Sequence, residues 1–261
     1  MKICLAPLDI AFANIEENLL TAAHTLNRVE SDTDVVVLPE LFTTGFVKDK
    51  NLAATLAEPN DGRTITTIQR WAQFFGFAIC GSFLATDRSG HLANRTFFVE
   101  PGGDTTFSDK RHLFPLSEEN KVYTPAMAEP QIIRFRGWSF KLIVCFDLRF
   151  PVWCRNRPGA DYDVLLVPAN WPESRQDQFK LLLAARAVEN QSYSVGCNRT
   201  GEDDYGKYPK GISVIYDNLG HPIHETRRDG LIYAILDKEE LNIGRKRFPA
   251  WEATDNWTIN F

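Results

Sequence analysis

The sequence of 261 residues lacks both a long apolar segment and a run of basic residues. No stretch reaches the roughly 18 to 20 apolar residues of a membrane-spanning helix, and the first residues lack the apolar core and cleavage site of a secretion signal. The 29 Lys and Arg residues, outnumbered by 34 Asp and Glu, nowhere form the basic stripe that binding to a phosphate backbone requires. We therefore expect a cytoplasmic protein that binds neither membranes nor nucleic acid.

Paired cysteines are missing as well. The five cysteines are scattered and form no CxxC motif: Cys4, Cys80, Cys145, Cys154 and Cys197. An odd number at such spacing argues against a disulfide framework and against a structural zinc site, so we expect no metal. Free thiols fit a reducing compartment. An isolated buried cysteine is usually an inert apolar residue, so any thiol chemistry needs further support.

What the sequence does contain is an alternation of helical and buried-strand patterns. The runs DVVVL (34–38) and DVLLV (163–167) are continuously apolar, as in strands buried on both faces. Helical spacing of apolar residues predicts helices at 14–29, 61–75 and 176–190. With no linker or low-complexity stretch, this pattern predicts a layered α/β structure in which two half-domains each contribute one such strand.

Polar residues stand at the ends of several predicted strands. Cys145 ends the strand in LIVCFDLRFP (142–151), at the rim of a sheet, where α/β proteins place their ligands. Glu40 directly follows a buried strand, where a carboxylate needs a partner or a task. Lys110 follows the predicted strand at 105–108. A nucleophilic cysteine needs a base or a cation nearby, and no histidine has neighbours that mark it for that role, so Glu40 and Lys110 are the candidates.

Taken singly, these residues also have plain structural interpretations. Glu40 fits a salt-bridged loop carboxylate, and Lys110 fits a solvated cation in an ordinary charged turn. The joint pattern decides between the two interpretations. VVVLPELFTTGF (35–46), DKRHLFP (109–115) and LIVCFDLRFP (142–151) resemble, in order and spacing, the three signature blocks of the nitrilase (carbon–nitrogen hydrolase) superfamily.

The resemblance spans nearly the whole chain and implies a fold and a catalytic triad. The implied fold is α/β, a four-layer αββα sandwich, formed as a single domain over residues 1–261. The implied triad is Glu40, Lys110 and Cys145. A second glutamate of the family, which precedes a Y-x-P-G-like segment, matches Glu119 before YTPA, where alanine replaces the glycine.

The chemistry that the resemblance implies needs neither a metal nor an organic cofactor. Glu40 takes the thiol proton, and the Cys145 thiolate attacks an amide carbonyl. Lys110 and the backbone N–H of Phe146 stabilise the oxyanion. Ammonia leaves a thioester, Glu40 activates water to hydrolyse it, and Glu119 orients Lys110 or the substrate.

Within the superfamily, CFDLRFPVW and the compact length are most similar to the ω-amidase branch, which hydrolyses the terminal amide of 2-oxoglutaramate or succinamate. Two alternatives use the same triad: hydrolysis of N-carbamoyl amines and hydrolysis of nitriles. From another class, a non-catalytic binding or redox-sensing protein would use Cys145 only as an oxidisable thiol. A papain-like hydrolase would need a catalytic histidine, which the sequence does not nominate.

The small amide substrate of an ω-amidase carries a carboxylate, so its pocket needs a cation. Arg149 and Lys110 are the candidates, although we expect Arg149 to pair with Asp147 or Asp161 in a structural role. Residues that follow a predicted strand end or a triad member are the expected pocket lining: Phe42, Phe114, Phe146, Asn170 and Trp171.

The last twenty residues are rich in aromatic side chains, among them Phe248, Trp251 and Trp257. Such a tail is too apolar to be a solvated, disordered end, so we expect it to pack against the body or against another subunit. Family members usually pair, and the resemblance therefore implies a homodimer.

Overall fold

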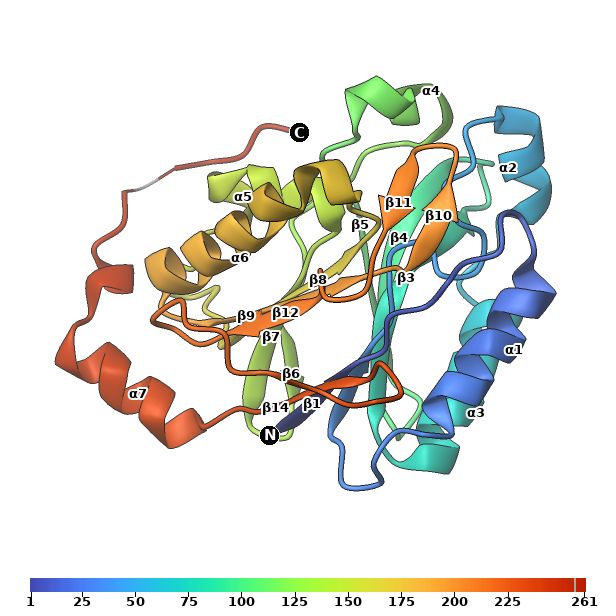
Figure 1. The fold of residues 1–261 in the computed structure, drawn as a ribbon. Helices are drawn as coiled ribbons and strands as arrows, with labels where there is room; N and C mark the ends of the chain where they lie inside the picture. The colour runs from blue at the N-terminus through green and yellow to red at the C-terminus, as the bar shows by residue number, and fades with distance from the viewer. Residues whose placement is uncertain (256) are drawn as a thin grey trace.

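The computed structural model of the protein describes residues 1–255 and 257–261 and contains two mixed β-sheets stacked face to face (Figure 1). The seven-stranded sheet has the order β13 (Glu225–Thr226), β14 (Ile232–Ile235), β1 (Lys2–Leu5), β2 (Val35–Val37), β3 (Ala78–Thr86), β4 (Leu92–Val99), β5 (Thr105–Asp109). The five-stranded sheet has the order β12 (Val214–Tyr216), β9 (Tyr193–Asn198), β8 (Val164–Ala169), β7 (Trp138–Leu142), β6 (Ile133–Phe135). A separate hairpin consists of β10 (Gly201–Asp203) and β11 (Gly206–Tyr208).

Side-chain alternation along the strands assigns the layers. In β2, Val35 and Val37 point into the apolar core between the sheets, whereas Val36 points into the core beneath the outer helices. The outer layers are formed by α1 (Ile15–Leu26) and α3 (Arg63–Phe75) on the seven-stranded sheet and by α5 (Pro151–Cys154) and α6 (Gln176–Asn190) on the five-stranded sheet (Figure 1). The predicted four-layer αββα sandwich is confirmed.

The central strands are apolar on both faces because each lies between two layers. β2 pairs in parallel with β1 and β3, and β8 pairs in parallel with β7 and β9. Burial of each valine side chain in such a strand contributes roughly 1.5–3 kcal/mol. The two runs that share a pattern in the sequence are thus central strands of different sheets.

Several elements lie outside the sandwich layers. They are α2 (Lys50–Leu56), α4 (Glu119–Val122), α7 (Lys238–Arg247) and the 3₁₀ helices η1 (Pro115–Ser117), η2 (Cys145–Arg149), η3 (Glu173–Arg175) and η4 (Ala250–Glu252). The sequence patterns did not predict α2, α7 or the β10–β11 hairpin. None of the helices in the described part of the chain is long and apolar enough to cross a membrane.

The end of the C-terminal tail packs on the body of the same chain. The Arg157 guanidinium lies 4.3 Å from the centre of the Trp257 ring, and Phe261 meets Trp153 edge to face at 6.3 Å. Phe248, in contrast, is 68% exposed. Trp257 and Phe261 therefore belong to the chain's own packing, while Phe248 has a largely open face.

Candidate active site

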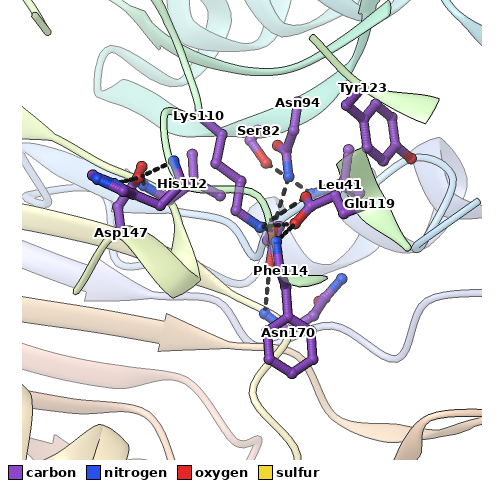
Figure 2. A network of polar contacts seen from close by, with 12 residues as sticks. Leu41, Ser82, Asn94, Lys110, His112, Phe114, Glu119, Tyr123, Asp147 and Asn170 are labelled. Atoms are coloured by element: carbon purple, nitrogen blue, oxygen red, sulfur yellow. Dashed lines mark hydrogen bonds and ion pairs between the residues drawn. The ribbon is translucent and has the colours of Figure 1, made fainter. Parts of the chain in front are cut away.

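The three residues of the predicted triad lie together at one end of the sandwich, on loops that leave different strands. Glu40 follows β2, Lys110 follows β5, and Cys145 follows β7. The Lys110 ammonium donates to Glu40 Oε1 at 2.9 Å. It also donates to Glu119 Oε1 at 2.8 Å (Figure 2). All four side chains are buried, with exposures of 1% for Glu119, 3% for Lys110, 4% for Glu40 and 8% for Cys145. The structure thus brings together the four residues that the sequence nominates.

Cys145 stands on a strained turn. Its φ of +44° lies in the left-handed region, which a non-glycine residue occupies at a cost of about 1–3 kcal/mol. The side chain of Asp147 holds this turn, because Oδ2 accepts the backbone N–H of Val144 at 3.1 Å. The turn leads the chain away from the direction of β7 and places Cys145 in the lining of a pocket.

The Glu40 carboxylate is held by three donors. Oε1 accepts from Asn94 Nδ2 at 2.8 Å and from Lys110, and Oε2 accepts from the backbone N–H of Asn170 at 2.9 Å. The bond to Asn170 crosses from one sheet to the other, because Glu40 follows β2 and Asn170 follows β8. Asn94, buried within β4, was not predicted, because it lies beside the polar residues Arg95 and Thr96 and nothing in the sequence distinguishes it from them.

The charges of the site keep the thiol protonated at rest. Burial and then the negative charge of Glu40 raise the pKa of Cys145 well above its usual range, and the opposing effect of Lys110 is smaller. Burial lowers the pKa of Lys110, but the charges of Glu119 and Glu40 outweigh it and hold that pKa well above its ordinary value. Lys110 therefore stays an ammonium, and a nucleophilic role for this thiol requires a base beside it.

Glu119 is the carboxylate that faces the lysine from the other side. Its two oxygens accept from Lys110 at 2.8 and 3.0 Å, and Oε2 also accepts the backbone N–H of Phe114. Burial raises the pKa of Glu119, and the lysine charge only partly offsets this. Glu119 thus fixes the direction of the Lys110 ammonium.

A pocket of about 240 Å³ opens onto Cys145. Its lining is Glu40, Phe46, Lys110, Phe114, Leu116, Ser117, Glu119, Cys145, Phe146, Arg149, Asn170, Trp171, Pro172, Arg175, Tyr205 and Tyr208. Four of the five residues expected to line it do so: Phe114, Phe146, Asn170 and Trp171.

The fifth, Phe42, does not line the pocket, and that prediction is wrong. Its ring is fully buried in the core beneath α1 and α3 and meets Phe97 edge to face at 5.9 Å. The cause is the turn at Leu41, whose φ is +46°. This turn lets the backbone N–H of Phe42 bond to the carbonyl of Ser82 at 3.1 Å and returns the ring to the apolar layer.

Two arginines reach the pocket without an acidic partner among the described residues. The expected pairing of Arg149 with Asp147 or Asp161 is wrong, because its guanidinium lies 4.9 Å from the centre of the Trp171 ring. Arg175, which sequence reasoning missed, lies 5.3 Å from the centre of the Phe114 ring. Its only signal in the sequence is its place four residues after Trp171. Aromatic faces hold both guanidinium groups and leave their N–H donors unused.

Two polar groups of the pocket lining are also without a partner in the part of the chain that the structure describes. Both polar atoms of the Asn170 side chain and the hydroxyl of Tyr205 are buried and make no hydrogen bond. A buried unpaired polar group costs about 1–3 kcal/mol. Tyr205 and Tyr208 come from the β10–β11 hairpin, which sequence reasoning took for a turn because of its glycines.

Comparison with known proteins places the whole chain in one family. Residues 3–243 match the sequence profile of the carbon-nitrogen hydrolases. A protein of Yersinia enterocolitica named omega-amidase YafV is 38% identical over 261 residues, which cover 99% of this chain and 98% of the relative. A 2-oxoglutaramate amidase of Bacillus subtilis is 31% identical over 247 residues, covering 94% of this chain and 93% of the relative.

A solved structure agrees with these sequence matches. The crystal structure of a CN-hydrolase superfamily protein from Xanthomonas campestris, with an arsenic adduct in its active site, aligns with a TM-score of 0.92 at 34% identity. The alignment covers 100% of this chain and 99% of that one.

Proposed function

This chain belongs to the carbon–nitrogen hydrolase family, in its ω-amidase branch, and hydrolyses the C–N bond of amides, and we propose that its substrate is the terminal amide of a small dicarboxylic acid monoamide. 2-Oxoglutaramate and succinamate are the candidates. The proposal gives the reaction as release of ammonia and a dicarboxylate through a thioester on Cys145.

One observation carries this choice of substrate. The pocket has the buried Glu40–Lys110–Cys145 centre in its lining and two guanidinium groups, of Arg149 and Arg175, without acidic partners among the described residues. A substrate with an amide at one end and a carboxylate at the other satisfies both. A volume of about 240 Å³ suits a short acid, since it is at the small end of ligand pockets.

In the proposed acylation step, Glu40 takes the proton from the Cys145 thiol as sulfur attacks the amide carbon. The proposal assigns one N–H of Lys110 to the two Glu119 oxygens and a second to Glu40. The third N–H, together with the backbone N–H of Phe146, stabilises the oxyanion. Glu40 then passes its proton to the leaving nitrogen, the C–N bond breaks, and ammonia departs from the acyl thioester.

In the proposed deacylation step, Glu40 takes a proton from water, and the hydroxide attacks the thioester carbon. The same donors stabilise the second oxyanion. The C–S bond breaks, the sulfur regains its proton from Glu40, and the dicarboxylic acid leaves. The unpaired side-chain amide of Asn170 is available to a polar group of the substrate in both steps.

Measuring ammonia release from matched substrates tests the proposal. We expect turnover of 2-oxoglutaramate and succinamate with a much higher kcat/KM than that of butyramide, which has the same chain length as succinamate but no carboxylate. The panel also includes an N-carbamoyl amine and a nitrile. Turnover of either of these without turnover of any short ω-amide would overturn the substrate assignment. The expected homodimer stays a prediction, which light scattering checks.

A further inference from the structure

Asp147 and His112 form a hydrogen-bonded pair next to the active site. Asp147 is two residues after Cys145, and His112 is two residues after Lys110. Asp147 Oδ1 accepts the backbone N–H of His112 at 2.8 Å and lies 2.8 Å from its Nδ1 (Figure 2). Oδ2 accepts the N–H of Val144. One carboxylate, 1% exposed, therefore bonds the segment after Lys110 and the turn that carries Cys145.

The histidine ring is fixed on its other sides. It stacks on Phe150 with ring centres 3.6 Å apart and planes 8° apart, and it meets Trp153 edge to face at 5.6 Å. Because Nδ1 lies against a carboxylate oxygen, which accepts hydrogen bonds, Nδ1–H is the donor of this bond. His112 is absent from the pocket lining, so it does not reach the substrate.

The pair joins the two sheets. Lys110 leaves β5, the edge strand of the seven-stranded sheet, whereas Cys145 leaves β7 of the five-stranded sheet. The core between the sheets is apolar, and apolar contacts have no direction that would fix a lysine relative to a thiol. In the described part of the chain, the hydrogen bonds of Asp147 are the only ones between residues 110–114 and 143–150.

We infer that Asp147 and His112 act as a cross-sheet clamp, a pair of positioning residues that sets the distance between the Lys110 ammonium and the carbonyl attacked by Cys145. This inference rests on the proposed roles of Lys110 and Cys145. A misplacement of about 1 Å costs up to about 100-fold in rate, so the clamp acts on kcat. It has little effect on KM, because neither residue contacts the substrate.

Two substitutions at His112 separate the hydrogen bond from ring packing. His112→Asn keeps an N–H near the position of Nδ1 but loses the stacking on Phe150. His112→Phe keeps a stacked ring but loses the Nδ1–H donor. The backbone N–H of residue 112 still bonds to Asp147 in both variants, so the comparison tests the side-chain bond of the clamp. The clamp predicts that H112F lowers kcat by about 10- to 100-fold, with KM changed less than about threefold, and that H112N retains most of kcat. The opposite order would overturn the inference.

Each kcat is divided by the number of Cys145 thiols that a haloacetamide alkylates at the rate seen in the wild type. Unfolded chains, whose exposed thiols react at a different rate, are thereby left out of the count, so that loss of folded protein does not appear as loss of rate. The Asp147–Val144 bond remains in both variants, so we expect the alkylation rate of Cys145 to stay near that of the wild type. The matched control is His91→Phe, because His91 pairs with Asp87 at 3.1 Å on the surface. Wild-type kcat per thiol in H112F, or equal losses in H112F and H112N, would also overturn the clamp.

A failure of the clamp is distinguishable from a failure of the proposed function. If Cys145→Ala still releases ammonia, the proposed nucleophile is wrong. If Cys145→Ala is inactive while H112F has the wild-type kcat per thiol, only the clamp is wrong.

Discussion

The sandwich has a buried charged cluster at each end of β8. The two clusters differ in how their carboxylates are balanced by cations. At the start of β8, Asp163 bonds to Arg245 at 2.9 Å and to Lys238 and accepts from Ser139 at 2.8 Å. At the other end, the backbone of Asn170 bonds to Glu40, the proposed base. The Asp163 cluster pairs one carboxylate with two cations. The Glu40 cluster combines two carboxylates and one lysine with a thiol and a pocket.

The pKa shifts of the two clusters have opposite signs. Burial raises the pKa of Asp163, but the hydrogen bonds from Lys238 and Ser139 outweigh it and lower that pKa overall. In the Glu40 cluster, burial raises the pKa of Glu119 and that of Cys145. A buried charge alone therefore does not mark a site; an imbalance of charge beside a pocket does. The predictions below test this difference, from the largest expected effect to the smallest.

Removing the thiol has the largest expected effect. Cys145→Ala removes the nucleophile, and ammonia release from the best substrate falls by about 10⁴-fold or more. The thermal midpoint changes little, because alanine keeps the Cβ and with it the backbone strain at φ +44°. Steady ammonia release at the wild-type rate would show that the Glu40 cluster is no more catalytic than the Asp163 cluster.

Neutralising Glu40 is expected to change the acidity of the Cys145 thiol and the rate of ammonia release in opposite directions: the thiol becomes more acidic while the rate falls. Glu40→Gln removes the base, so kcat falls by about 10²- to 10⁴-fold. The negative charge of Glu40 raises the thiol pKa, so its removal lowers that pKa, and alkylation of Cys145 sets in at a lower pH. Alkylation rates from pH 6 to 10 measure this shift. A profile that moves to higher pH would contradict the assigned electrostatics.

The pocket arginines are expected to act on one class of substrate. Arg149→Gln and Arg175→Gln each lose a donor to the substrate carboxylate, worth about 1.5–3 kcal/mol, or roughly 10- to 150-fold in kcat/KM. The kcat/KM for butyramide, which has no carboxylate, stays within about threefold in the same variants. Equal losses on both substrates would assign the arginines to the pocket wall alone.

Asp163 is expected to affect stability but not catalysis. Asp163→Asn lowers the free energy of unfolding by about 1–3 kcal/mol. This loss is smaller than for a fully buried ion pair, because the Lys238 side chain is 35% exposed and water screens its charge. The pKa of Asp163 is lowered in the folded protein. The stability that its charge contributes to the wild type is therefore fully present above the ordinary pKa of 3.8, and it is lost as the pH falls through the lowered pKa. Urea unfolding at pH 7 and pH 3 measures this, with kcat per Cys145 thiol as control. A fall in that kcat would show that the Asp163 cluster also contributes to catalysis, contrary to the distinction drawn between the two ends of β8.

The sequence predicted the layers and the polar strand ends because these depend on local patterns. Continuous apolar runs identified the central strands β2 and β8, and two residues that follow predicted strands, Glu40 after β2 and Cys145 after β7, were found by position. Phe42 failed because a left-handed turn at Leu41 lies between it and the strand end, and nothing in the sequence marks that turn.

The missed pocket residues depend on contacts between distant segments. Arg175 is recognised only when Phe114 is seen beneath its guanidinium group. Arg149 was a candidate cation from the sequence, and only its contact with Trp171 replaces the ion pair expected for it. His112 was set aside because its neighbours in sequence are unremarkable, while its partner Asp147 is 35 residues away. Such pairings follow from how the two sheets stack, which periodicity does not reveal.

The bond between Glu40 and the backbone of Asn170 joins the two sheets, so enzymatic turnover reports whether the sheets have docked. The proposed base and the lysine follow strands of one sheet, whereas the thiol and the proposed oxyanion donor follow a strand of the other. A refolding chain that has formed either sheet alone has no complete centre. Recovery of ammonia release therefore tracks the docking of the two sheets and follows the recovery of secondary structure in time.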